Sequence, residues 1–293
     1  MLDRLFQHTI EDKYAKKHNK EKILKDISNL STQIDRLAEV IEVYSQKEYY
    51  ESKTIRLARI RAMDKRELAI EVIANLVVIK DKQPIQAISG ILAGHLKYED
   101  ILDGIKTSAE LIALSSKIGL CKIIRAADSE TGSLLVSSKY KLEPETLDKI
   151  ELTKFLPPMI CKPDKVNWNN QSAYLTFDDS IILGKQTFHT EKLCLDVINI
   201  QNAIPLELDE RLLEYPELSS KPLDTPEKIE NHERMVRTSK IVTEELVNQG
   251  NRFYLTNKPD SRGRFYSMGY HVNIQGSKYK RSLISFADKE VIR

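Results

Sequence analysis

The sequence has few of the residues from which disulfide frameworks and zinc sites are built. It has three cysteines among 293 residues, and they lie far apart in the chain. An odd number excludes a fully paired disulfide framework, and no cysteine or histidine cluster has zinc-ligand spacing. We therefore expect reduced, buried cysteines in a cytosolic protein that has no metal site of its own. The three are Cys121, Cys161 and Cys194.

Long apolar runs and the short motifs of several enzyme classes are also missing. No run approaches the ~20 apolar residues of a membrane-spanning helix, and the polar residues after Met1 predict no signal peptide, so no membrane partner is expected. Neither glycine-rich phosphate loop occurs, nor the Gly-x-Ser-x-Gly of serine hydrolases. Asp178 and Asp179 are adjacent, and adjacent strand residues point to opposite faces, which favours a turn over a metal pair. The sequence predicts no catalytic residue and no cofactor bound by this chain.

Helix-breaking residues are absent from the first eighty positions, since the first proline is Pro84 and the first glycine is Gly90. Apolar residues there recur at alternating steps of four and three, as in the a and d positions of a heptad seam. The seam needs another helix to cover it. An intramolecular helical hairpin is favoured over a dimeric coiled coil because the run is short. The seam residues are Ile23, Ile27, Leu30, Ile34, Leu37, Ile41 and Tyr44.

Local signals predict two further helices. Asp64 followed by Glu67 is a capping box, which marks a helix start. Residues 224–227 place a proline near a first helical position and predict a helix that ends near Asn248, before Gly250.

A basic run lies just before the capping box. A solvated helix face is the favoured interpretation, and contact with upstream duplex DNA is an alternative that only a family resemblance of the C-terminal half implies. Residues 85–150 predict further short helices separated by glycines. The basic residues are Lys53, Arg56, Arg59, Arg61, Lys65 and Arg66, and the glycines are Gly90, Gly94, Gly104 and Gly119.

The composition indicates a folded globular protein, with 41% hydrophobic and 30% charged residues. With the helical first half, it predicts a fold that is mainly α with small β elements (α+β). The net charge is only +2, but it is uneven: residues 191–235 carry eleven acids and five bases, and residues 252–281 carry seven bases and one acid. The basic segment also holds six of the twenty aromatic residues. This interleaving is typical of nucleic-acid binding, and a β-hairpin with a solvated basic edge is the alternative.

The most informative stretch runs from Asp260 to Tyr266, with the sequence Asp-Ser-Arg-Gly-Arg-Phe-Tyr. If it is extended, Arg262, Arg264 and Tyr266 share one face, because strand side chains alternate. Planar guanidiniums beside an aromatic ring suit a phosphate backbone with a base to stack on. Gly263 would let another backbone come close. Asp260 either holds a turn by an Asx-type bond or pins one arginine by a salt bridge.

Three segments, in the same order, resemble the single-subunit RNA polymerases of the phage and mitochondrial type. The Asp-x-Arg-Gly-Arg-x-Tyr run resembles the start of that family's palm, where an Asp-x-x-Gly-Arg motif holds the template strand and RNA–DNA hybrid. Residues 156–168 resemble the proline-rich entry to a promoter-melting hairpin, and residues 197–206 resemble the helix that closes the N-terminal domain. The resemblance covers roughly residues 150–293. Ser261 departs from it, because phage members usually carry tryptophan there.

The resemblance implies the N-terminal subunit of a phage DNA-directed RNA polymerase split into two polypeptides. Its expected parts are a helical N-terminal domain (1–150), a promoter-side region (151–220), a short thumb-like helix (221–250) and the start of a palm (251–293) completed by another chain. The family's metal-binding aspartates lie beyond the position of Arg293. The chain is therefore expected to be inactive alone, with Mg²⁺ and the catalytic palm and fingers on a second polypeptide. The implied location is the cytoplasm of an infected bacterial host.

The resemblance also assigns site residues. A hairpin within residues 173–189 would wedge an apolar tip between base pairs, and an ordinary hairpin packed in the core is the alternative. Its tip residues are Ile181, Ile182 and Leu183. A basic stripe on the thumb-like helix (Arg234, Arg237, Lys240) suits the hybrid or solvent. The residues expected to bind template DNA and RNA–DNA hybrid are Asp260, Arg262, Gly263, Arg264, Tyr266, Lys278, Lys280 and Arg281.

Two other functions stay open from the sequence. One is a stand-alone DNA-binding transcription factor derived from such a polymerase. The other is a helical scaffold protein whose heptad seam is its working surface.

Overall fold

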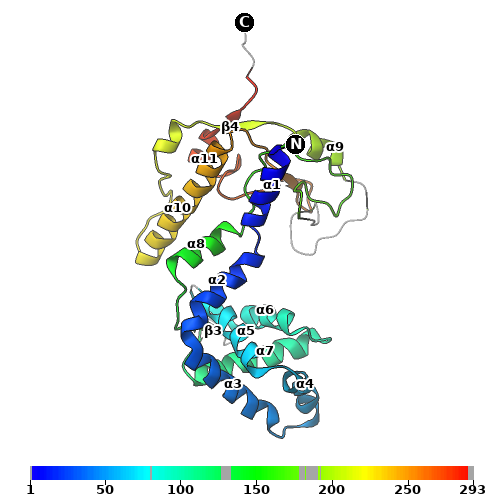
Figure 1. The fold of residues 1–293 in the computed structure, drawn as a ribbon, viewed down its shortest axis with the longest axis vertical. Helices are drawn as coiled ribbons and strands as arrows, with labels where there is room; N and C mark the ends of the chain where they lie inside the picture. The colour runs from blue at the N-terminus through cyan, green and yellow to red at the C-terminus, as the bar shows by residue number, and fades with distance from the viewer. Residues whose placement is uncertain are drawn as a thin grey trace. The chain divides into compact units, whose positions relative to one another are not determined.

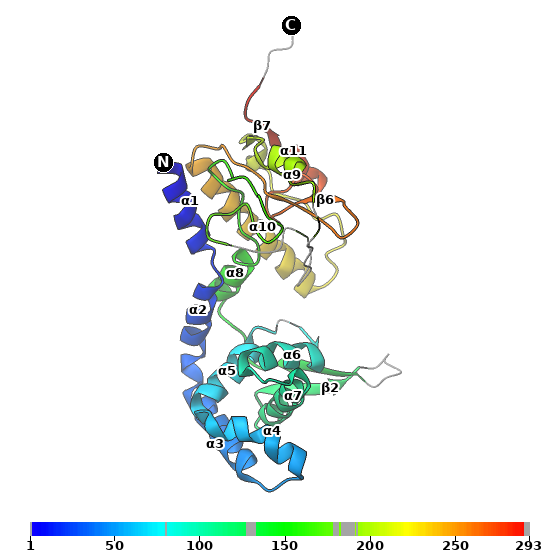
Figure 2. The same cartoon turned by 90° about the vertical axis from the view of Figure 1, so that its right-hand side faces the viewer.

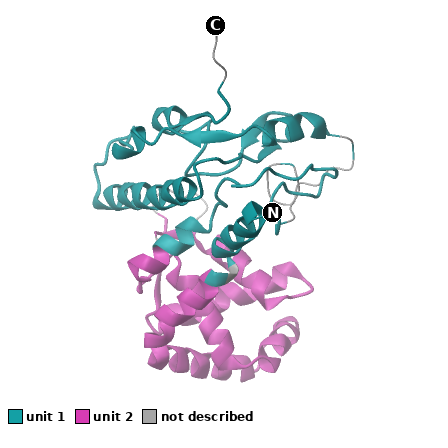
Figure 3. Ribbon diagram, turned by 45° about the horizontal axis from the view of Figure 1, so that its top comes forward, with its two compact units in different colours: residues 1–18, 148–293 teal, residues 19–147 magenta. Residues whose placement is uncertain are grey.

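The computed structural model is mostly helical, with three small antiparallel sheets among the residues that it describes (Figure 1 and Figure 2). The predicted α+β class is therefore confirmed. The chain divides into two compact units (Figure 3): unit 1 comprises residues 1–18 and 148–293, and unit 2 comprises residues 19–147. Within the described ranges, no helix is long and apolar enough to cross a membrane. Those ranges are 2–79, 81–126, 133–177, 182, 191 and 193–289, without the side chain of Lys17.

Unit 2 packs helices against a three-stranded sheet in which β3 pairs antiparallel with β1 and with β2. Helix α3 contacts α4, α5 and α7, and α6 lies alongside α7 (Figure 2). The elements are α2 (Lys17–Ile27, which begins in unit 1), η1 (Ser28–Leu30), α3 (Ser31–Gln46), α4 (Glu51–Ala62), α5 (Lys65–Val77), β1 (Gln83–Pro84), α6 (Ile85–Leu96), α7 (Ile101–Lys117), β2 (Cys121–Arg125) and β3 (Leu134–Ser138).

The heptad seam is covered within the chain. Its central residues Ile34, Leu37 and Ile41 are at most 3% exposed, and they lie on α3, which packs on neighbouring helices of unit 2. The intramolecular interpretation is therefore confirmed. A 3₁₀ turn at 28–30 interrupts the helix that the heptad pattern alone would continue.

The glycines of residues 85–150 do not separate short helices as expected. Gly90 lies inside α6 and Gly104 lies inside α7, and only Gly119, at φ +86°, follows a helix end. A Cβ at Gly104 would lie 3.1 Å from the Cβ of Ala93, so this glycine lets α7 approach α6 closely. Glycine weakens a helix by only about 1 kcal/mol, which tertiary packing overrides. Strands β2 and β3 were not expected from the sequence.

An ion pair between the buried Arg56 and the half-buried Glu110 joins two helices of unit 2. The guanidinium of Arg56 on α4 donates to both carboxylate oxygens of Glu110 on α7, at 2.7 and 3.0 Å, and to the hydroxyl of Thr107 at 2.8 Å. Tyr44 also donates to Glu110. Burial disfavours the charge of Glu110, but bonds from Arg56, Tyr44 and Lys53 outweigh burial and lower its pKa. Part of the basic run is therefore structural.

Unit 1 has a core in which helices α1 and α10 pack with strands β4 and β7 and the fully buried Phe253. Strand β4 pairs antiparallel with β7, and β5 with β6. The elements are α1 (Leu2–Lys13), α8 (Pro144–Leu152, which begins in unit 2), α9 (Leu195–Asn202), β4 (Leu206–Leu208), η2 (Leu212–Glu214), α10 (Pro226–Asn248), β5 (Asn257–Pro259), β6 (Phe265–Ser267), α11 (Lys278–Ser282) and β7 (Ile284–Phe286).

Both helix starts predicted from local signals are confirmed. The Asp64 side chain accepts from the backbone N–H of Glu67 at the start of α5. Thr225 caps α10, whose first residue is Pro226, and α10 ends at Asn248 before Gly250. By contrast, the first strand expected of the hairpin within residues 173–189 is absent, because residues 173–176 form bends. Ala173 is buried, and the carboxylate of Glu11 accepts hydrogen bonds from the backbone N–H groups of Leu175 and Thr176.

Candidate nucleic-acid interface

The basic C-terminal segment contains a tight hairpin of strands β5 and β6. Asn257 lies opposite Ser267, and Pro259 lies opposite Phe265. The five residues between the strands, Asp260–Arg264, form the turn, and we call them the arginine loop. Strand β5 is buried along its length, whereas loop residues 261–264 are exposed. The hairpin therefore holds two arginines at the surface on a buried base.

Asp260 organises the arginine loop by accepting hydrogen bonds from both arginines. Its Oδ1 accepts from the backbone N–H of Arg262 at 2.9 Å and of Arg264 at 3.0 Å. Its Oδ2 accepts from Nε and Nη2 of Arg264, at 2.9 and 2.7 Å, and from Nη2 of Arg262 at 3.4 Å. The sequence left open whether Asp260 holds the turn or pins an arginine, and it does both. The hydrogen bond from the Arg264 backbone N–H, together with the bonds from the Arg264 guanidinium, lowers the pKa of Asp260, and burial opposes this shift.

Gly263 is required by the conformation of the turn. Its φ is +80°, a region that side chains with L chirality rarely adopt. Its N–H donates to the carbonyl of Asp260 at 2.9 Å, which closes the turn. A Cβ at this position would meet no described heavy atom within 4 Å. No described part of this chain comes close, and approach by a nucleic-acid backbone stays a prediction.

The two loop arginines remain largely accessible. Their side chains are 70% exposed for Arg262 and 53% exposed for Arg264. The Cζ of Arg264 lies 5.6 Å from the ring centre of Tyr266, within cation–π range. Residues 260–264 are not extended, because the Asp260 bonds and Gly263 fold them into a turn. The turn, rather than strand alternation, brings both guanidiniums to one carboxylate.

Amide side chains, which the sequence analysis did not single out, anchor the hairpin. The Oδ1 of Asn202 on α9 accepts from the backbone N and Nδ2 of Asn257, at 2.8 and 3.0 Å. The hydroxyl of Ser267 donates to Oδ1 of Asn257 at 2.9 Å. Gln275 accepts from the Ser267 N–H and donates to the Phe265 carbonyl, both at 2.9 Å. The loop is therefore carried on a hydrogen-bonded frame.

The three segments on which the family resemblance rests meet around this hairpin. Met159, from the proline-rich segment, exchanges two backbone hydrogen bonds with Tyr254, at 3.0 and 2.7 Å. Asn202 belongs to the segment 197–206, and Gln275 lies nine residues after Tyr266, the last residue of the Asp-x-Arg-Gly-Arg-x-Tyr run. A lone amide has no characteristic spacing, so the sequence could have marked Asn202 only by its membership of that segment and gave no signal for Gln275.

The other predicted basic contacts differ in accessibility. Lys278 and Arg281, on α11, are exposed. Lys280 is only 7% exposed: its Nζ donates to the carbonyl of Tyr270 at 2.8 Å and lies 4.3 Å from that ring centre. Burial lowers the pKa of Lys280, while nearby Glu217 opposes the shift. A nucleic-acid contact by Lys280 stays a prediction, and it would require the ammonium to leave these partners.

The predicted intercalating tip falls mostly outside the described residues. Ile181 and Leu183 are not described. Ile182 is 6% exposed and packs in a small apolar cluster with Val166, Ala173 and Ile198. The intercalating role therefore stays a prediction, and for Ile182 the described packing fits the alternative of a hairpin packed in the core.

The basic stripe on α10 has acidic partners within unit 1. Arg237 donates to both carboxylate oxygens of Asp148, at 2.6 and 2.7 Å. Arg234 is 5% exposed and pairs with Glu230.

The described part of the chain also contains no group of three or more histidine, cysteine, aspartate or glutamate side chains that could hold a metal ion.

Two curated proteins resemble the chain over about half of its length. One, from Agaricus bitorquis, is described as a probable DNA-directed RNA polymerase and is 25% identical over 171 residues, which is 46% of this chain. The other, from Gelasinospora sp. (strain G114), has the same description and is 24% identical over 178 residues, which is 55% of this chain. No protein-family model matches the chain.

The aligned regions cover only 15% and 20% of the two fungal proteins. The chain is thus distantly related to part of proteins described as DNA-directed RNA polymerases, which indicates a role related to polymerases. The catalytic activity of those whole proteins does not follow for these 293 residues from the alignments.

Proposed function

We propose that this chain is a non-catalytic subunit of a DNA-directed RNA polymerase of the single-subunit type. In this proposal, Arg262 and Arg264 bind phosphates of the template strand and RNA–DNA hybrid, and the region around residues 181–183 supports promoter melting. A second polypeptide supplies the catalytic palm, the fingers and the carboxylates that hold Mg²⁺. The complex works in the cytoplasm of an infected bacterial host.

The observation that carries the proposal is the arginine loop itself. A planar guanidinium offers five N–H donors, and Asp260 engages only two on Arg264 and one on Arg262. The remaining donors belong to exposed side chains, and the turn fixes the backbone of both arginines. Positioned guanidiniums suit bidentate phosphate binding, which the distant similarity to polymerases supports.

The phosphate contact is tested by the salt dependence of binding. Arg264→Ala should lower the slope of log affinity against log salt by about 0.9 for duplex, or about 0.7 for a single strand. Arg211→Ala is a matched control, because Arg211 is an exposed arginine that binds Asp209 through the same two donors, Nε and Nη2, within the acidic segment. Unchanged slopes for Arg264→Ala would contradict the assignment.

The subunit role is tested by ribonucleotide incorporation on a preformed RNA–DNA scaffold. The chain alone should be inactive, and the complex that co-purifies from the native source should extend the RNA. Arg264→Ala in the complex should shorten the transcripts. Synthesis by the chain alone would refute a non-catalytic subunit. DNA binding with no retained polypeptide and no synthesis would favour a stand-alone DNA-binding protein.

A further inference from the structure

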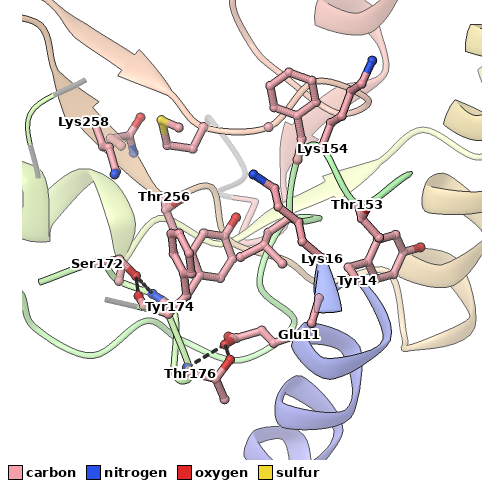
Figure 4. Close-up of a pocket in the computed structure, with 18 residues that line it drawn as sticks. Glu11, Tyr14, Lys16, Thr153, Lys154, Ser172, Tyr174, Thr176, Thr256 and Lys258 are labelled. Atoms are coloured by element: carbon pink, nitrogen blue, oxygen red, sulfur yellow. Dashed lines mark hydrogen bonds between the residues drawn. The ribbon is translucent and has the colours of Figure 1, made fainter. Parts of the chain in front are cut away.

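Unit 1 contains a cavity of about 390 Å³ (Figure 4). The segments around it come from the end of α1, the residues after α8, the irregular loop 172–177, the start of β5 and the residues after β6. This volume falls within the range of small-molecule and cofactor sites. None of the functions assigned above uses this cavity.

Aromatic side chains provide flat apolar surface in the cavity. Phe155, Tyr174 and Phe177 line it, and Phe177 is 48% exposed. The hydroxyl of Tyr174 donates to the carbonyl of Pro157 at 3.0 Å, which fixes the position of the ring. Phe155 is stacked on Tyr270, with ring centres 5.3 Å apart. Aromatic rings that line an accessible cavity suit stacking of a nucleobase, which is largely independent of base identity.

The charge of the cavity is positive where it is accessible. The ammonium of Lys16 points toward the centre of the cavity, whereas that of Lys154 points away (Figure 4). Lys154 pairs with Glu151 at 2.8 Å. Glu11 also lines the cavity, but both of its carboxylate oxygens accept hydrogen bonds from loop 172–177, at 2.6 to 2.9 Å. Lys16 therefore favours an anionic group beside the rings.

We propose that this cavity binds one unpaired nucleotide, with the base against Tyr174 and Phe177 and the phosphate near Lys16. The inference extends the proposed function, because Lys258 lines the cavity and lies on β5 two residues before Asp260. At about 3.3 Å per strand residue, that separation is roughly 7 Å. A single strand held by the arginine loop would then have a neighbouring nucleotide within reach of the cavity.

The binding test uses the full chain and a short oligodeoxythymidylate that carries one 2-aminopurine, whose fluorescence is quenched by stacking. Phe177→Ala should weaken binding about tenfold, because stacking on an aromatic ring contributes on the order of 1–3 kcal/mol. Lys16→Ala should have an effect of about the same size, because a hydrogen bond to a charged group contributes on the order of 1.5–3 kcal/mol. Lys165→Ala and Phe6→Ala are matched controls, since both residues are exposed in unit 1 and neither lines the cavity.

A second arm distinguishes the source of the nucleotide. If free 2-aminopurine nucleoside monophosphate binds with the same dependence on Lys16 and Phe177, the cavity accepts free nucleotides. If only the oligonucleotide does, the ligand is a nucleotide of a single strand. Either result supports the proposal. Unchanged affinity of both cavity variants for both probes would overturn it.

Photocrosslinking locates the base without any substitution that could disturb folding. An oligonucleotide with one 5-iodouracil should crosslink to Tyr174 or Phe177 in the unmodified chain, as mapped by mass spectrometry. Crosslinks confined to other residues would overturn the cavity assignment. The proposed function fails separately, because it predicts that Arg264→Ala weakens strand binding whatever the cavity variants do.

Discussion

Replacement of Asp260 by alanine should weaken nucleic-acid binding even though it removes a negative charge from the most basic segment. Electrostatics alone predicts the opposite, because one acid fewer raises the attraction for phosphate. The structure predicts weakening because Asp260 accepts five hydrogen bonds that position Arg262 and Arg264. Without them, both arginines regain rotamer freedom that binding must remove.

The magnitude follows from the number of arginines that the carboxylate holds. If each arginine neutralises one phosphate, loss of both lowers the salt slope by about 1.8 on duplex and about 1.4 on a single strand. Between 50 and 200 mM salt, a slope change of about 1.8 corresponds to roughly a twelvefold change in relative affinity. Loss of one arginine contact alone would give about 3.5-fold.

The assay is a binding titration at four or more salt concentrations, with Asp209→Ala as the matched control. The Asp209 carboxylate accepts hydrogen bonds from the backbone N–H and the guanidinium of Arg211, much as Asp260 accepts from its arginines. This pair lies in the acidic segment, residues 191–235. The control should bind as well as the unmodified chain, or slightly better. Tighter binding by Asp260→Ala, with an unchanged slope, would refute the view that this carboxylate positions the arginines.

Three further predictions concern stability and can be measured by native-state hydrogen exchange, which reports each unit separately. Arg56→Ala should destabilise unit 2 by about 2 kcal/mol, because it removes a buried guanidinium and leaves the half-buried Glu110 with fewer hydrogen-bond donors, whereas Arg66→Ala, in an exposed pair, should cost less than about 1 kcal/mol. Gly263→Ala should destabilise its turn by about 1 kcal/mol because φ is positive, whereas Gly90→Ala, inside α6 with open space, should stabilise by about 0.5–1 kcal/mol. Burial, aided by the charge of Lys280, lowers the pKa of His271 from 6.5 to about 4. The unfolded state therefore binds a proton that the folded state does not bind. The free energy of unfolding should fall by up to roughly 3 kcal/mol from pH 7 to 4 through this group, and His271→Gln should remove that part of the fall.

Features that depend on a few neighbouring residues could be predicted from the sequence. The start of α5 at Asp64 and the span of α10 from Pro226 follow from capping and helix-start signals that act within one turn. The burial of the heptad seam follows from its period, because a continuous apolar stripe must be covered. Its covering helices could not be identified, since that choice depends on contacts between distant residues.

Features set by tertiary contacts were missed. Gly104 indicated a helix boundary, yet it lies inside α7 because α6 approaches there, and no local signal encodes that approach. Likewise, the amides of Asn202 and Gln275 became part of the candidate site only once the fold brought them to the hairpin. Composition singled out the basic segment, but it could not say which of its polar groups bind one another.

Tertiary contacts also limit how many residues of the basic segment can bind nucleic acid. The sequence counts seven basic residues in 252–281, and if all contacted duplex phosphates the salt slope would be about 6.3. In the structure Lys258 and Lys280 are at most 8% exposed. The exposed remainder is Arg252, Arg262, Arg264, Lys278 and Arg281, so the segment should contribute a slope of at most about 4.5. A contribution near 6, measured by removing all seven charges, would mean that the buried lysines turn outward when nucleic acid binds.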